Sequence, residues 1–182
     1  REELGNNFPE RQIAVAKAPA TAVEEAVYEQ LMNVSFHHLD GGASGSGHLF
    51  RTTLEKALFS SPAACASTVT NRRTKLERRL KTERDEEKQT TLIEDIASLQ
   101  GLQLALEGAT LPEHFSKYQL LLREIQTMEW SGKDPEDRLV IFTESLVSLD
   151  YLNEHLPQDL KLKDKQVAIL RGDQRDKDIM DT

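Results

Sequence analysis

The chain has 182 residues, a net charge of −8 and one cysteine, Cys65. A single cysteine excludes a disulfide framework and indicates a reducing, cytoplasmic setting, and no apolar run approaches the ~20 residues that cross a bilayer. The acidic balance argues against a free-standing nucleic-acid binder, because phosphate contact usually requires a basic face, but it leaves room for a local basic strip.

Residues 1–40 are predicted to form a strand followed by a helix. Gln12–Ala16 is a short apolar strand candidate, and Thr21 with Glu24 three residues later is the pattern of a capping box. The following helix has apolar residues at helical spacing, namely Val23, Ala26, Val27, Leu31 and Val34. Residues 41–47, GGASGSG, are predicted to be a flexible linker, either natural or engineered.

Residues 48–130 are predicted to be a helical region with a projecting hairpin. Leu49–Phe59 is expected to form one helix, and Ser61 followed by Pro62 is expected to start the next. That helix is predicted to continue through Lys81–Lys88, where almost every side chain is charged and therefore solvated. A returning helix has its apolar residues at Leu92, Ile93, Ile96, Leu99, Leu102 and Leu106. The two helices together should form an antiparallel hairpin.

The last helix of this region is predicted to begin with a second capping box, formed by Thr110 and Glu113. Its buried face is predicted to consist of Phe115, Tyr118, Leu122, Ile125 and Met128. Ser131–Asp137 is a polar turn that ends the region.

Residues 131–182 are predicted to contain a βαβ unit. Leu139–Phe142 is an apolar run typical of a strand buried on both faces. Leucines at helical spacing then run from Leu146 to Leu156, and a second strand is predicted at Val167–Leu170. In open α/β sheets, ligands bind beyond the carboxyl ends of the strands. Any site in this region is therefore expected at residues 143–145 and 171–173.

Several local patterns invite a functional interpretation that their context does not favour. Asp85–Lys88 has the letters of an acidic ATPase box but lies in a charged helix, and Gly132-Lys133 lacks the glycine and hydroxyl of a phosphate loop. His37-His38 has no third ligand nearby, so exposed histidines are expected rather than a metal site. The basic residues of the second long helix could contact nucleic-acid phosphates or form salt bridges; they are Arg72, Arg73, Lys75, Arg78, Arg79 and Lys81.

The order of these pieces resembles the middle of a superfamily-two helicase, in particular the Snf-type and related bacterial nucleic-acid-dependent ATPases. Phe8–Tyr28 resembles the end of the first RecA-like lobe, and Leu54–Pro62 resembles the polar-plus-proline break that follows. Ser116–Leu121 resembles the family's helix that opens with a lysine, after a helical protrusion. Arg138–Glu144 is similar to helicase motif IV, and Leu149–Leu152 to the LDxL helix that follows it.

The resemblance implies a fold that is mainly α with a small α/β part, in which a helical bundle and hairpin are followed by an incomplete RecA-like βαβ unit. Residues 131–182 would begin lobe two. The chain would be a segment of an ATP-dependent translocase or helicase that couples the two motor lobes and is not catalytic alone. The family's phosphate loop, acidic box and arginine-bearing motif VI are absent here, so ATP and Mg²⁺ would bind elsewhere in the full-length enzyme.

The resemblance also implies site residues and partners. Thr143, Ser145, Arg171 and Gly172 would lie near a nucleic-acid phosphate backbone. The partners would be DNA or RNA and the remaining helicase lobes, in the cytoplasm or at a bacterial nucleoid, with no membrane. For Ser145 an equal alternative is that it only caps the next helix.

Two further alternatives stay open. The chain could instead be a non-catalytic helical protein-interaction module that works through its charged hairpin. The two predicted strands would also leave apolar faces and a sheet edge uncovered. The isolated chain is therefore expected either to self-associate through this sheet or to pack it against its own helices, with the helical part more stable.

Overall fold

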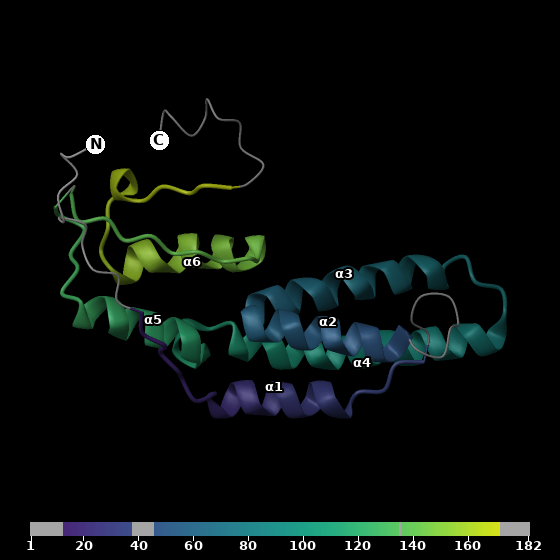
Figure 1. The fold of residues 1–182 in the computed structure, drawn as a ribbon. Helices are drawn as coiled ribbons and strands as arrows, with labels where there is room; N and C mark the ends of the chain where they lie inside the picture. The colour runs from purple at the N-terminus through teal and green to yellow at the C-terminus, as the bar shows by residue number, and fades with distance from the viewer. Residues whose placement is uncertain (1–12, 38–45, 135, 172–182) are drawn as a thin grey trace, which may run out of the picture.

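The computed structural model describes residues 13–37, 46–134 and 136–171. This part of the chain is mainly helical, as predicted (Figure 1). Its helices are α1 (Ala22–Asn33), α2 (Ser46–Ser60), α3 (Pro62–Leu80), α4 (Glu86–Ala109), α5 (Ser116–Thr127) and α6 (Leu146–Asp159), with short 3₁₀ turns η1 (Pro112–His114) and η2 (Asp164–Gln166). No helix within these residues is long and apolar enough to cross a membrane.

Helix starts follow the predicted capping residues in α1 and α3. The Thr21 hydroxyl accepts from the Glu24 amide at 3.2 Å, and the Glu24 carboxylate accepts from the Thr21 amide at 2.8 Å, which completes the predicted capping box. Ser61 accepts from the Ala64 amide at 3.1 Å, with Pro62 in the first helical position. Local chemistry alone is enough to place these two boundaries.

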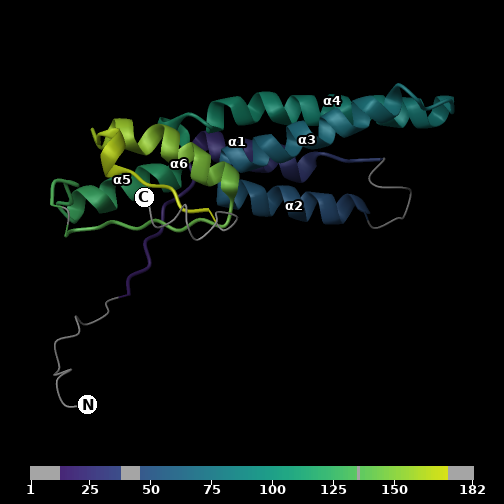
Figure 2. The same cartoon turned by 90° about the horizontal axis from the view of Figure 1, so that it is seen from above.

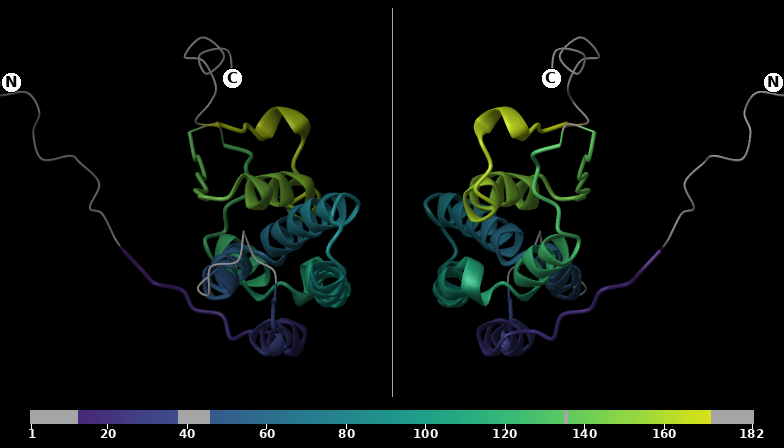
Figure 3. Two further views of the ribbon diagram at one scale, coloured as in Figure 1. Left: turned by 90° about the vertical axis from the view of Figure 1, so that its right-hand side faces the viewer. Right: turned by 90° about the vertical axis from the view of Figure 1, so that its left-hand side faces the viewer.

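The helical body consists of α1 to α4, with α3 and α4 forming the predicted antiparallel hairpin (Figures 1 and 3). Its core is a continuous cluster of buried side chains from all four helices. The largest contribution comes from α4, whose Leu92, Leu99, Leu102 and Leu106 are fully buried. Helix α6 lies on the α3 side of this body, and α1 lies on the opposite side (Figures 1 and 3).

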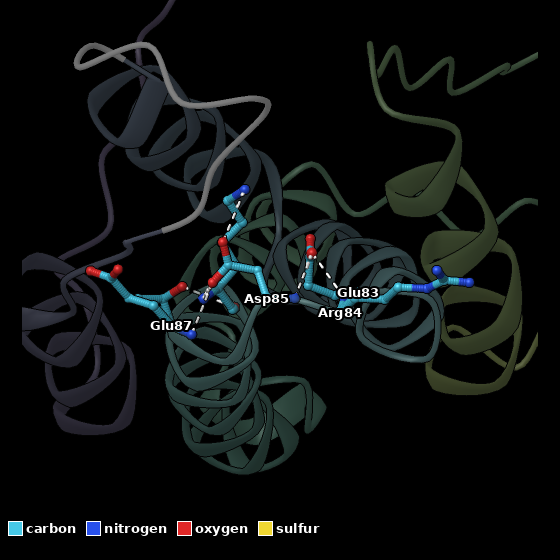
Figure 4. Close-up of polar contacts among 6 residues, drawn as sticks. Glu83, Arg84, Asp85 and Glu87 are labelled. Atoms are coloured by element: carbon cyan, nitrogen blue, oxygen red, sulfur yellow. Dashed lines mark hydrogen bonds and ion pairs between the residues drawn. The ribbon is translucent and has the colours of Figure 1, made fainter.

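The hairpin tip differs from the prediction of a helix continuing through Lys81–Lys88. Helix α3 ends at Leu80, and α4 begins at Glu86 with Asp85 as its N-cap. The Asp85 carboxylate accepts from the amides of Glu87 at 3.0 Å and Lys88 at 3.2 Å (Figure 4). The charged run therefore breaks because Asp85 binds the backbone donors that a continuous helix would satisfy internally.

Two other predicted boundaries are wrong. Thr110 does not cap a new helix, because its hydroxyl donates to the Glu107 carbonyl at 2.8 Å and so closes α4. Helix α5 starts after Phe115 without a side-chain cap. In the predicted linker 41–47, residues 41–45 lie outside the described part of the chain, but Ser46 and Gly47 already belong to α2.

The predicted strands are absent from the described residues, and this is the main correction to the fold. Residues 13–16, 139–142 and 167–170 have no regular secondary structure, and Gln12 lies outside the described part. Val140 and Phe142 are 65% and 91% exposed, whereas Leu139 and Ile141 are partly buried, so one face of the run predicted to be buried on both faces is open to solvent. A strand needs backbone partners, and two short segments without neighbouring strands make at best a marginal sheet.

Cys65 is fully buried in the core of the helical body. Burial raises the pKa of its thiol to about 12, because the thiolate loses its hydration. We expect the native chain to react very slowly with a thiol-specific reagent such as Ellman's reagent, and to react fully once urea unfolds it. Fast reaction under native conditions, at the rate of the unfolded chain, would contradict this packing.

Candidate functional site

Three of the four predicted site residues lie near the N-terminal half of α6. Ser145 is the N-cap of α6, and its hydroxyl accepts from the Ser148 amide at 3.2 Å. The Thr143 hydroxyl accepts from the Ser145 amide at 3.3 Å. Ser145 therefore does cap α6, which is one of the two roles that the sequence allows for it.

Arg171 follows the second extended segment, residues 167–170, and contacts α6. Its guanidinium Nη2 donates to the Asp150 carboxylate Oδ1, and both side chains are partly exposed, at 38% and 58%. An exposed pair of this kind contributes little to stability, because water and salt compete with it. The guanidinium is thus held at the protein surface at little energetic cost. Gly172 lies outside the described residues.

The backbone of residues 139–170 follows the path of a βαβ crossover, but the two extended segments are not hydrogen-bonded to each other. Residues 139–142 and 167–170 run in the same direction, and α6, which connects them in the chain, runs in the opposite direction (Figures 1 and 2). No backbone hydrogen bond joins the two segments within residues 136–171. Thr143 and Arg171 consequently follow corresponding ends of the two segments, where sequence reasoning expected the site.

A buried serine cluster connects α6 to the helical body. The Ser148 hydroxyl lies 2.7 Å from the Ser61 hydroxyl and 3.1 Å from that of Ser60. Ser61 and Ser148 are buried, so each hydroxyl satisfies the other away from water. Sequence reasoning missed this cluster. The Ser60-Ser61-Pro62 break was its only local signal, and nothing local indicated Ser148 as its partner.

Aromatic side chains form a second connection of α6, in this case to α5. Tyr151 packs edge-on against Phe115 and Tyr118, with ring centroids 5.6 Å apart in both pairs. The Tyr118 hydroxyl donates to the Asp159 carboxylate at 2.5 Å. Edge-to-face aromatic pairs add about 0.5–1.5 kcal/mol beyond burial of their area. Helix α6 is therefore anchored at both ends, by Ser148 near its start and Asp159 at its end.

The tyrosine contacts predict alkaline sensitivity. Burial raises the pKa of Tyr118 above its ordinary value, and the Asp159 carboxylate raises it further; burial raises the pKa of Tyr151 to about 12. Because the folded state holds these protons more tightly than the unfolded state, the stability is present below about pH 10 and falls as pH rises toward the folded pKa values.

We therefore expect the free energy of unfolding to decrease above about pH 10, and the double variant Tyr118→Phe/Tyr151→Phe to show a shallower decrease. Urea titrations at a series of pH values measure this. Tyr28→Phe is the control, because Tyr28 lies on the exposed face of α1. Equal slopes for the double variant and the unchanged chain would contradict the expectation.

Comparison with known proteins leaves the family open. No protein-family model matches the chain, and neither the curated proteins nor the solved structures contain a match. The class defined by the fold is a helical body with an attached crossover whose polar groups cluster at one end.

Proposed function

We propose that this chain is a segment of an ATP-dependent nucleic-acid translocase or helicase, in which it couples the two motor lobes and supplies motif IV. The observation that best supports the proposal is the position of Thr143, Ser145 and Arg171 around the first half of α6. Hydroxyl donors, a guanidinium and a helix N-terminus are groups that bind phosphate oxygens. Arg171 would exchange its exposed Asp150 partner for a backbone phosphate.

The anchoring of α6 supports the coupling role. Lobe two of a motor must transmit its displacement to the rest of the enzyme, and transmission requires a stiff connection. Ser148 buries its side chain between α6 and the start of α3 in the helical body. Tyr151 buries its side chain between α6 and α5, and Ala63 of α3 packs against the same cluster. A displacement of α6 would therefore move the helical body with it rather than being absorbed in a flexible joint.

The proposal includes a RecA-like α/β lobe in the full-length enzyme. There, residues 139–142 and 167–170 would become strands once neighbouring strands supply backbone partners. The exposure of Phe142 and Val140 supports this, because large apolar side chains in an extended segment gain about 1.5–3 kcal/mol each when covered. The same surface would allow the isolated chain to self-associate.

The isolated chain is expected not to hydrolyse ATP. Phosphoryl transfer needs groups that hold Mg²⁺ and the β- and γ-phosphates, and the proposal assigns these to other parts of the enzyme. Asp85, the first residue of the box-like sequence, instead has its carboxylate committed to the α4 N-terminus (Figure 4). A turnover assay with and without duplex DNA checks this. Hydrolysis stimulated by DNA in this chain alone would contradict it.

The proposal itself is tested in the full-length protein. We expect nucleic-acid-stimulated ATP hydrolysis, and we expect Arg171→Gln combined with Thr143→Ala to lower that stimulation at least about tenfold while basal hydrolysis changes little. Lys133→Gln is the matched control, since Lys133 is exposed and precedes the first extended segment. Full-length protein that lacks a phosphate loop and acidic box, or whose ATP hydrolysis ignores nucleic acid, would refute the proposal.

The second candidate is a non-catalytic helical interaction module. The predominance of helix and the long hairpin favour it. Size exclusion and pull-down with the isolated chain distinguish the two. A specific protein partner that binds independently of nucleic acid supports the module, and phosphate-dependent binding supports the motor segment.

A further inference from the structure

We infer that the outer half of α3 and the turn that follows it form a separate binding surface for the phosphate backbone of duplex nucleic acid. The surface, called the basic row below, consists of Lys75, Arg78, Lys81 and Arg84. The row extends the proposed function, on which the choice of nucleic acid as ligand partly rests. It lies outside the group around Thr143 and Arg171.

The basic row is exposed and unneutralised. All four side chains are exposed, and none makes an ion pair within the described residues. The neighbouring Arg73 behaves differently, because it bonds Gln103 at 2.6 Å and Glu77 at 3.2 Å. The expectation that the basic residues of α3 form salt bridges therefore holds for Arg73 but not for the row.

Two acidic side chains of the hairpin tip, Glu83 and Asp85, form no ion pair with the row and accept hydrogen bonds from the backbone instead. The Glu83 carboxylate accepts from the amides of Arg84 at 3.1 Å and Asp85 at 3.3 Å, and these bonds lower its pKa. Asp85 caps α4 and pairs with Lys88 at 3.4 Å. Figure 4 shows the Arg84 side chain extending to one side of the tip and Glu87 to the other.

The outer end of the row, at Lys81 and Arg84, lies on the same side of α3 as α6. Ala63 packs against the aromatic cluster of α5 and α6. Lys81 follows Ala63 by about five helical turns, which returns it to the same side of the helix some 27 Å further along. In Figure 4, Arg84 likewise extends toward the side of α6, whereas Glu87 extends toward the side of α1.

The basic row and the start of α6 lie at different distances along α3. Ser148 bonds Ser61 at the first turn of α3, so the N-terminus of α6 lies near that end of the helix. The row begins at Lys75, about 20 Å further along α3. A duplex has one backbone charge per ~1.7 Å of its axis, so roughly ten base pairs laid along α3 could reach both places.

The surroundings of the row favour phosphate over a protein partner. No large hydrophobic side chain is exposed between Ser60 and Leu92. Protein interfaces draw most of their affinity from aromatic and apolar anchors, which this surface lacks. Binding to phosphates needs only positioned cations and the release of counterions.

The test measures binding of the chain to a labelled duplex of ~30 base pairs between about 50 and 200 mM salt. The row variant replaces Lys75, Arg78, Lys81 and Arg84 by Gln. The control replaces Lys56, Arg123, Lys133 and Lys165 by Gln, which removes the same charge from exposed positions elsewhere. Glutamine preserves helix propensity, and circular dichroism of both variants verifies folding.

We expect the row variant to bind at least about tenfold more weakly at low salt, with a salt slope shallower by about 3 to 4 than that of the unchanged chain. The control variant should keep most of the affinity at low salt and most of the salt slope. Equal losses in row variant and control, or no duplex binding by the unchanged chain at low salt, would overturn the inference. Competition by polyglutamate as effective as that by duplex would also overturn it, in favour of an acidic polypeptide.

An Arg171→Gln arm separates this inference from the proposed function. If only the row variant binds more weakly, the basic row contacts the duplex and Arg171 does not contact a phosphate. Weakened binding in Arg171→Gln alone supports the proposed function and overturns the row. Loss in both supports one duplex contacting both places.

Discussion

Replacing Leu102 by Ala is expected to lower the free energy of unfolding by about 2–5 kcal/mol. Leu102 lies on the core face of α4 and is fully buried among side chains of the helical body. Its truncation removes apolar contacts and leaves a cavity that the packed helices cannot fill. Urea unfolding followed by circular dichroism measures the change, which should appear as an earlier midpoint with little change in slope.

Leu104→Ala is the matched control for this prediction. Leu104 lies two residues further along the same helix and is 63% exposed. The two variants share their chemistry and helix propensity, so the difference between them reports burial alone. We expect Leu104→Ala to change stability by about 0.5 kcal/mol or less. Coinciding unfolding curves for the two variants would mean that α4 does not present this face to the core.

Replacing Tyr151 by Ala is expected to loosen α6 from α5 and from the start of α3. The side chain is nearly buried and packs against Phe115 and Tyr118, so its removal should cost about 3–5 kcal/mol at this contact. The remaining serine cluster is too small to replace that apolar burial. Native-state hydrogen exchange should show faster exchange in α6, with α3 and α4 unchanged.

The control is Leu146→Ala in the first turn of α6, where the side chain is 57% exposed. It should leave the exchange of α6 nearly unaltered. If Tyr151→Ala accelerates exchange in α4 as much as in α6, the chain is one cooperative unit and the anchored-helix description is wrong. If neither helix changes, the aromatic contact does not hold α6.

Prediction from sequence succeeded where structure depends on neighbouring residues. Thr21 and Ser61 placed two helix starts because a capping hydroxyl bonds an amide only three residues away. The helical spacing of Leu92, Leu99, Leu102 and Leu106 likewise predicted the buried face of α4, whereas Ile93 of the same set is 54% exposed. The failure at Asp85 was also local, since its capping pattern was present but was read as a solvated helix.

The candidate site was predicted in part. Thr143, Ser145 and Arg171 do follow corresponding ends of two extended segments, but the Asp150 partner of Arg171 was not predicted. Ser148 and Ser61 are separated by 87 positions, and no sequence period relates them. The same distance in sequence hid the contact between Tyr118 and Asp159.

Sequence alone determined which segments are helical and which side of each helix is apolar, because propensity, capping and periodicity act within a few residues. Tertiary structure decided whether Leu139–Phe142 is a strand, and in the described chain it is not. It also decided which basic residues of α3 are neutralised. Strand pairing and charge pairing both depend on partners distant in sequence, so neither outcome can be obtained from the segment itself.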